Sequence, residues 1–301
     1  MRVVTVPASF DHRGVDGLLD RSHAQSDERV LFNAHRVRWI DPSGMLALLV
    51  AGRDQALRGG KPILKLPENA DVVSYLRRMN FLKEADSVFE LAGRTAGRTS
   101  FAKSDALLEV TRIDSHHHVR ALVGKIQSRA GDILSGRLGL PGTAVIPFSI
   151  VLSEVCQNVV EHAGPGEVGW VAVQVYNWAQ RLGRYAAVIS VMDCGIGFRR
   201  SLERRHGADH GGAWDDTAAL RAAVFRGLSR FAETGRGQGL REVRRQVLRW
   251  RGAMSVRSGG SRIALGGAPW SEQPSLVSKL RPFPGAQLVI IIPAAEEDGR
   301  Q

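Results

Sequence analysis

The stretch Glu154-Val-Cys-Gln-Asn158-Val-Val-Glu161 begins the pattern that decides the fold of this chain. Glu154, Asn158 and Glu161 stand at positions i, i+4 and i+7, so in an α-helix they fall within about 60° of one another. The residues between them are mostly apolar, which predicts a polar stripe along a helix that is otherwise packed. Such a stripe fits either a solvated helix face or a site for a ligand, a metal or a partner.

A second motif, Asp193-Cys-Gly195-Ile-Gly197, follows an apolar run over residues 185–192 that predicts a buried strand. Asp193 therefore ends that strand, where its carboxylate can accept a hydrogen bond from an exocyclic amine such as that of adenine. Gly195 and Gly197 let the backbone approach a flat ligand closely. The same residues also suit an ordinary turn from strand to loop.

The third motif, Gly235-Arg-Gly237-Gln-Gly239, precedes a stretch over residues 240–250 whose apolar spacing is helical. A glycine-rich loop that opens a helix offers free backbone N–H groups to phosphates. Arg236 lies in this loop and could bind a phosphate through two hydrogen bonds or lie in solvent. No strand precedes the loop, so it does not match a dinucleotide-binding fingerprint, and we recognise no Walker loop.

In this order the three motifs resemble the GHKL superfamily, the ATP-binding fold of gyrase, MutL, the large heat-shock chaperone, histidine kinases and the serine kinases that inhibit sigma factors. The resemblance covers residues 105–295 and includes a closing strand over residues 285–293, where Ala286 replaces the usual threonine. It implies an α/β sandwich that binds ATP with Mg²⁺. Residues 198–234 would form the lid over the nucleotide, with a helix over residues 216–231.

The resemblance also implies a role for each matching residue. Glu154 would be the general base, and Asn158 would hold Mg²⁺ against the phosphates. Asp193 would bind the adenine amine. The remaining residues of the implied nucleotide site are Gly195, Gly197, Gly235, Arg236, Gly237 and Gly239.

The first ninety residues form a different unit. Strand-like runs over residues 3–6, 30–32 and 62–66 alternate with helical stretches, which predicts a small α/β domain. Asp41 and Pro42 are typical of a helix start, as N-cap and first residue, and an apolar helix follows. The segment resembles a STAS domain, the fold of anti-sigma-factor antagonists. In that family the serine matching Ser43 accepts phosphate from a GHKL serine kinase, although Pro42 replaces a small hydroxylic residue.

The sequence thus predicts a STAS-like domain over residues 1–90, a linker over 91–104, the nucleotide-binding domain over 105–295 and a tail over 296–301. A chain of 301 residues with 44% hydrophobic content is sufficient for two such cores. We expect residues 105–135 to form a helix that enters the second domain.

Composition and charge limit the other classes of protein to which this chain could belong. Two cysteines without paired spacing argue against a disulfide framework or a structural zinc site. We recognise no signal peptide and no apolar stretch of 18 residues, which predicts a cytoplasmic protein without membrane contact. The net charge of +11 would suit nucleic acid, but no DNA-reading motif is recognisable. The arginine clusters at residues 199–205 and 241–251 have the spacing of solvated helix faces, and an acidic protein partner would explain the charge equally well.

These features predict a bacterial regulator of the partner-switching kind. The leading hypothesis is a Mg²⁺-dependent serine/threonine kinase that acts on a STAS domain, with Ser43 of the same chain as a candidate acceptor. A STAS-domain or sigma-factor-like regulatory protein is the expected partner, and dimerisation is left open. The alternative is an ATP-gated interaction switch whose lid opens or closes a binding surface, with slow hydrolysis or none.

Overall fold

The computed structural model describes residues 1–22, 28–94, 106–164, 167–178, 182–207, 214–230, 238–266 and 275–296. Its N-terminal unit contains β1 (Arg2–Thr5), β2 (Ser9–Phe10), η1 (His12–Gly14), α1 (Val15–Ser22), β3 (Val30–Asn33), β4 (Trp39–Ile40), α2 (Pro42–Gly59), β5 (Ile63–Lys65), α3 (Ala70–Arg78), α4 (Phe81–Val88) and β6 (Glu90–Ala92). Its C-terminal unit contains β7 (Ala106–Ile113), α5 (His116–Leu138), η2 (Gly142–Ala144), α6 (Val145–His162), β8 (Gly169–Trp178), β9 (Arg184–Asp193), α8 (Gly197–His206), α9 (Asp216–Arg221), the π-helical turn η4 (Ala222–Arg226), α10 (Gly239–Arg249), β10 (Ala253–Gly259), β11 (Ser261–Gly266), β12 (Ser275–Val277) and β13 (Phe283–Pro293).

The N-terminal unit is the small α/β structure that the alternating pattern predicts. Its four-stranded sheet has the order β1-β3-β5-β6, and every neighbouring pair is parallel. The helix start at α2 is also confirmed, because the Oδ1 atom of Asp41 accepts a hydrogen bond of 2.9 Å from the backbone N–H of Gly44. Strand β6 extends to Ala92, which is two residues beyond the predicted end of the unit.

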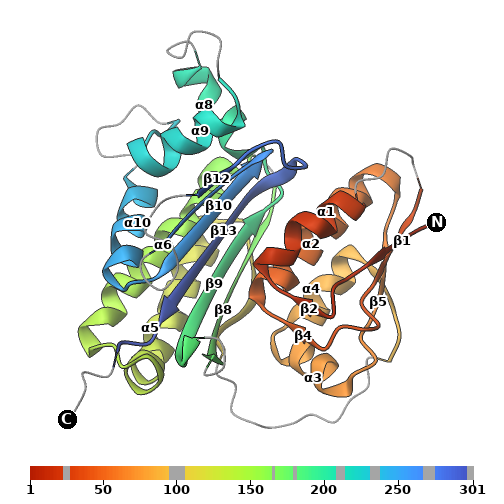
Figure 1. Ribbon diagram of the computed structural model, residues 1–301, viewed down its shortest axis with the longest axis horizontal. Helices are drawn as coiled ribbons and strands as arrows, with labels where there is room; N and C mark the ends of the chain where they lie inside the picture. Colours follow the sequence, from red (N-terminus) through yellow and green to blue (C-terminus); the bar gives the residue numbers. More distant parts are fainter. Residues whose placement is uncertain are drawn as a thin grey trace.

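The C-terminal unit is built on a seven-stranded sheet with the order β12-β11-β10-β13-β9-β8-β7. Helices α5, α6 and α10 cover one face of this sheet (Figure 1). The two strands predicted over residues 185–192 and 285–293 are confirmed as β9 and β13, which pair directly with each other in the antiparallel sense. The sheet region therefore agrees with the mixed α/β sandwich that the nucleotide-binding motifs imply.

The helix expected over residues 105–135 is wrong in its first part. Residues 106–113 form strand β7, which pairs with β8 at the edge of the large sheet, and helix α5 begins only at His116. The side chain of Ser115 caps this helix by accepting a hydrogen bond from the backbone N–H of His118. The strand is favoured because its apolar and β-branched residues gain cross-strand partners that a helix would not provide.

Helix α2 lies between the two sheets. Residues 42–52 are all buried, and the helix contacts β8, β9 and β13 of the large sheet as well as α1 and α4 of its own unit. A helix that is apolar on every side is expected to be buried on every side. Its hydrophobic cluster includes Trp170, Met192 and Phe283 from the large sheet. The two units therefore share one core, and the N-terminal unit covers the sheet face opposite α5, α6 and α10 (Figure 1).

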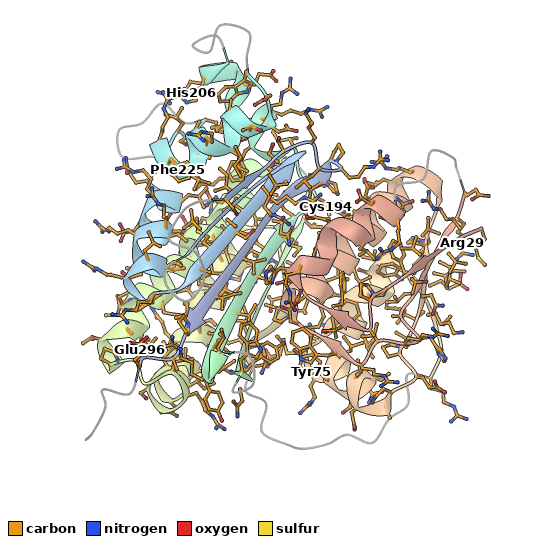
Figure 2. All side chains as sticks on the ribbon, viewed as in Figure 1. Arg29, Tyr75, Cys194, His206, Phe225 and Glu296 are labelled. Atoms are coloured by element: carbon orange, nitrogen blue, oxygen red, sulfur yellow. The ribbon has the colours of Figure 1, made fainter. Side chains whose placement is uncertain are left out.

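Polar contacts also join the two units. The hydroxyl groups of Tyr75 and Tyr176 are hydrogen-bonded at 2.7 Å (Tyr75 is labelled in Figure 2). Asp16 on α1 binds two arginines of the large sheet, Arg257 through Oδ1 and Arg262 through Oδ2, the latter at 2.6 Å. Arg257 is only 1% exposed, so its charge depends on this partner. We call Asp16, Arg257 and Arg262 the interdomain ion cluster.

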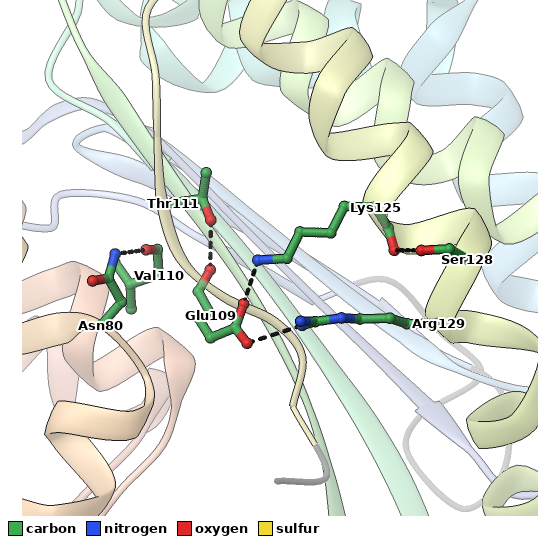
Figure 3. Close-up of polar contacts among 7 residues, drawn as sticks. All are labelled: Asn80, Glu109, Val110, Thr111, Lys125, Ser128 and Arg129. Carbon is green, nitrogen blue, oxygen red and sulfur yellow. Dashed lines mark hydrogen bonds and ion pairs between the residues drawn. The ribbon is translucent and has the colours of Figure 1, made fainter.

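Strand β7 forms a seam between the units (Figure 3). On one side, Nδ2 of Asn80 donates a hydrogen bond of 2.9 Å to the carbonyl oxygen of Val110. On the other side, the carboxylate of Glu109 binds Lys125 at 2.6 Å and Arg129 at 2.9 Å on α5. Strand β7 is the edge strand on this side of the large sheet. The N-terminal unit covers it, which protects the edge from pairing with another chain.

One helix among the described residues, Gly142–Glu161, is long and apolar enough to cross a membrane by length and composition. The prediction that no such stretch occurs was therefore wrong. This stretch includes α6, whose Phe148, Leu152 and Val155 are buried in the main core of the C-terminal unit. Core packing accounts for part of its hydrophobicity, and the exposed Ile146 and Ile150 account for another part.

Candidate functional site

Two adjoining hollows lie between α6, α8, α10 and the large sheet. The first is mainly apolar, and its lining includes Asp193 and Asn158. The second is larger and more polar. Four residues line both hollows, so the two are continuous: Asn158, Phe198, Ser201 and Leu240. An apolar recess that opens into a polar one suits a ligand with a flat ring at one end and charged groups at the other.

Asp193 ends strand β9 and is 7% exposed. Its Oδ1 atom accepts hydrogen bonds from the backbone N–H groups of Gly195, at 2.8 Å, and Ala286, at 3.3 Å. Burial raises the pKa of this carboxyl group to about 7, against the lowering effect of these two hydrogen bonds. Among the described residues none donates to its second oxygen, which is left for a donor on a ligand.

Three glycines at or beside the first hollow stand where side chains would not fit. A Cβ atom at Gly195 would lie 2.2 Å from the backbone of Ala163, and one at Gly285 would lie 2.2 Å from the carbonyl oxygen of Asp193. Gly197 has a φ of +70°, and its Cβ would lie 2.6 Å from Oγ of Ser258. These glycines are therefore required by close packing within the protein, and their predicted approach to a flat ligand stays a prediction.

Ser258 is a residue of the site that sequence reasoning missed. Its hydroxyl group donates to the carbonyl oxygen of Gly285 and accepts from the backbone N–H of Phe198, both at 3.0 Å. It therefore joins β10, β13 and the start of α8 behind the glycine loop. No local signal identifies it, because its partners lie far away in the sequence.

The polar hollow brings together the stripe of α6. Glu154, Asn158 and Glu161 all line it, as does Glu242 of α10. The pKa of Glu154 is raised by burial and then by the charges of Glu161 and Glu242. Gly239 lies against this stripe, since a Cβ atom there would approach Oε2 of Glu154 to 2.3 Å.

Asn158 gives the clearest indication of a ligand-binding site. Its Nδ2 atom is buried and has no hydrogen-bond partner among the described residues. Buried donors in native proteins are nearly always paired, so this one calls for an acceptor such as a phosphate oxygen. The Oδ1 atom of the same side chain is a suitable ligand for Mg²⁺. No group of three acidic, histidine or cysteine side chains able to hold a metal occurs among the described residues.

Four predicted site residues remain, three of which the structure does not describe. Gly235, Arg236 and Gly237 lie outside the described residues. Ser43 lies in the first turn of α2, is 0% exposed, and its hydroxyl group has no hydrogen-bond partner among the described residues. Because α2 packs on the opposite face of the large sheet, the structure separates Ser43 from Glu154.

The predicted lid is only partly described. Helix α8 occupies its start, and the predicted helix from residue 216 is present as α9 and η4, which end at Arg226. Two side-chain contacts join the described segments of this region. Nε1 of Trp214 donates a hydrogen bond to the carbonyl oxygen of Arg199. Nε2 of His206 lies 2.9 Å from the carbonyl oxygen of Ser229.

Residues 144–272 match the family model of the histidine kinase-, DNA gyrase B- and HSP90-like ATPases. The matched range contains α6, both glycine motifs and β9, and so includes most of the two hollows. No curated protein and no solved structure matches the chain. The match supports a GHKL ATPase domain in this part of the chain and, with it, an ATP-binding regulator in general.

Proposed function

We propose that this chain is a signalling regulator that binds ATP with Mg²⁺ and acts as a serine/threonine kinase on a STAS domain of another chain. The observation that carries the proposal is the continuous pair of hollows, with Asp193 at the apolar end and Asn158 and Glu154 at the polar end. This order matches the order of adenine, phosphates and reacting group in ATP.

The residues present fit such a ligand. The second oxygen of Asp193 would accept the adenine amine while Val191, Val256 and Leu288 contact the ring. The unpaired Nδ2 atom of Asn158 would donate to a phosphate oxygen. Bound Mg²⁺ would neutralise phosphate charge, and it usually needs only one or two protein ligands beside the phosphates and water.

Glu154 has the properties of a general base. It lies one helical turn from Asn158 in the polar hollow, and its raised pKa makes its carboxylate a stronger base than an ordinary glutamate. In the proposed reaction Glu154 takes the proton of a serine or threonine hydroxyl as that oxygen attacks the γ-phosphorus, whose bond to the β,γ-bridging oxygen breaks so that ADP leaves. Geometry therefore favours an acceptor that enters the hollow from solvent.

The burial of Ser43 favours an acceptor on another chain. Its hydroxyl group would have to leave the shared core before any kinase could reach it. The same burial favours a second candidate function, the ATP-gated interaction switch, in which nucleotide changes the lid and a partner reads that change without phosphate transfer.

One experiment separates these functions. The wild-type chain, Asn158→Ala and Glu154→Gln would be incubated with γ-labelled ATP, Mg²⁺ and a purified STAS-domain protein, followed by phosphosite mapping. Label on the STAS protein that disappears in both variants, with ATP still bound by Glu154→Gln, is the result expected of the kinase. Bound ATP without protein label would favour the switch, and failure of the wild type to bind ATP would refute both.

A further inference from the structure

The outer faces of α6 and α10 carry a surface that the nucleotide site does not use. We define the α6–α10 surface by Ile146 and Ile150 of α6 and by Arg241, Arg245 and Leu248 of α10. The two helices lie side by side on the sheet (Figure 1), and Phe148 contacts Trp250 between them with ring centroids 6.2 Å apart. Packed helices lie about 8–10 Å apart, so residues on both outer faces can touch one bound segment.

The apolar part of this surface consists of three exposed side chains. Ile146 is 66% exposed, Ile150 is 47% exposed and Leu248 is 38% exposed. The two isoleucines are four residues apart and therefore share one face of α6. Single exposed apolar residues are common, whereas an apolar patch rimmed by polar residues is typical of an interaction site.

The charged part is a stripe of arginines along α10. Arg241, Arg245 and Arg249 are spaced by four residues and are all exposed. A shallow hollow of about 660 Å³ runs along this face, and its one carboxylate, Glu242, forms an ion pair of 2.5 Å with Arg245. Within the described residues Arg241 and Arg249 form no ion pair, so the stripe keeps a net positive charge.

We propose that the α6–α10 surface docks an acidic amphipathic helix of a protein partner. The acidic face of that helix pairs with the arginine stripe, and its apolar face covers Ile146, Ile150 and Leu248, which is the helix-in-groove mode of recognition. From Arg241 to Arg249 the stripe spans about 12 Å, or roughly two turns of a bound helix. A nucleic acid would supply phosphates for the arginines but would leave the isoleucines without apolar contacts.

This inference goes beyond the proposed function, and its test needs no nucleotide. The same two helices nevertheless form the nucleotide site, because Glu154 and Asn158 lie on α6 and Gly239 begins α10. Ile150 stands four residues before Glu154 on the same helix, so a partner on this surface lies next to the polar hollow.

The test uses the full-length chain and fluorescence anisotropy with a labelled 18-residue helical peptide that has leucine on one face and glutamate on the other. A peptide with lysine in place of glutamate and a labelled 20-nucleotide single strand of DNA serve as competing probes. The double variant Arg241→Glu with Arg245→Glu is compared with a matched control on α8, Arg200→Glu with Arg204→Glu, which has the same spacing and exposure. Thermal melts confirm that each variant folds.

We expect the acidic peptide to bind and the lysine peptide not to bind. The α10 double variant should weaken binding about tenfold or more, and the α8 control by less than about twofold. Ile150→Ser should weaken binding about fivefold, and this effect should persist at high salt, where charge contributions are screened. Equal losses in the α8 control, no effect of Ile150→Ser, or DNA binding tighter than peptide binding would each overturn the proposal.

Discussion

Replacing Asp193 by asparagine is expected to stabilise the nucleotide-free protein, and by more as the pH rises. Burial raises the pKa of the Asp193 carboxyl to about 7 from the ordinary value of 3.8. Between these two values the folded state holds more protons than the unfolded state, so the free energy of unfolding falls as the pH rises and the loss is complete above pH 7. Each pH unit in this window is worth about 1.4 kcal/mol, which gives about 4 kcal/mol in total.

Asparagine has the same shape and no charge, and its Oδ1 atom can still accept the hydrogen bonds from Gly195 and Ala286. The stability difference between Asp193→Asn and wild type should therefore grow by about 2–3 kcal/mol from pH 5 to pH 8. Urea unfolding at several pH values measures this difference. Asp86→Asn, at an exposed position, is the control and should show no such growth. Parallel pH curves for Asp193→Asn and wild type would show that burial does not perturb this carboxyl group.

The same carboxyl group should make nucleotide affinity depend on pH. An adenine amine donates more strongly to the ionised form, and the ionised fraction rises about tenfold from pH 6 to pH 8 for a pKa of about 7. Titration calorimetry with ATP and Mg²⁺ should therefore show affinity rising about tenfold over this range. In Asp193→Asn, binding should be weak and independent of pH. A wild-type affinity that is flat or falls with pH would exclude Asp193 as the adenine acceptor.

Two further predictions concern the shared core. Asp16→Asn leaves the buried Arg257 without its carboxylate and should lower the free energy of unfolding by about 2–3 kcal/mol. Asp16→Glu keeps a carboxylate and should recover part of this loss. A melting temperature unchanged in Asp16→Asn would show that the pair does not hold the units together. Gly52→Ala places a Cβ atom 2.2 Å from the ring of Phe89 and should lower the free energy of unfolding by about 1–3 kcal/mol. In Gly124→Ala, on α5, the Cβ atom meets no atom within 4 Å, so this control should be neutral or stabilising by up to about 1 kcal/mol. Equal unfolding midpoints for the two alanine variants would contradict this description of the packing.

The resemblance in the sequence anticipated most of the candidate site because its motifs are local. The spacing of Glu154 and Asn158 on one helix face and the position of Asp193 at a strand end follow from helical and strand periodicity alone. The N-cap at Asp41 is equally local. Ser258 could not be predicted, because it meets the glycine loop only after strands that are distant in sequence have paired.

By itself, the sequence determined that a small α/β unit precedes a domain with the motifs of a nucleotide-binding α/β sandwich, and that an apolar helix begins at Pro42. Only the tertiary structure decided what covers that helix. An apolar run shows that a surface must be buried but does not show against what, and here the large sheet supplies the second wall. Residues 106–113 form a strand because they pair with β8 in the folded protein. Ser43 is buried in the shared core, on the other side of the large sheet from Glu154.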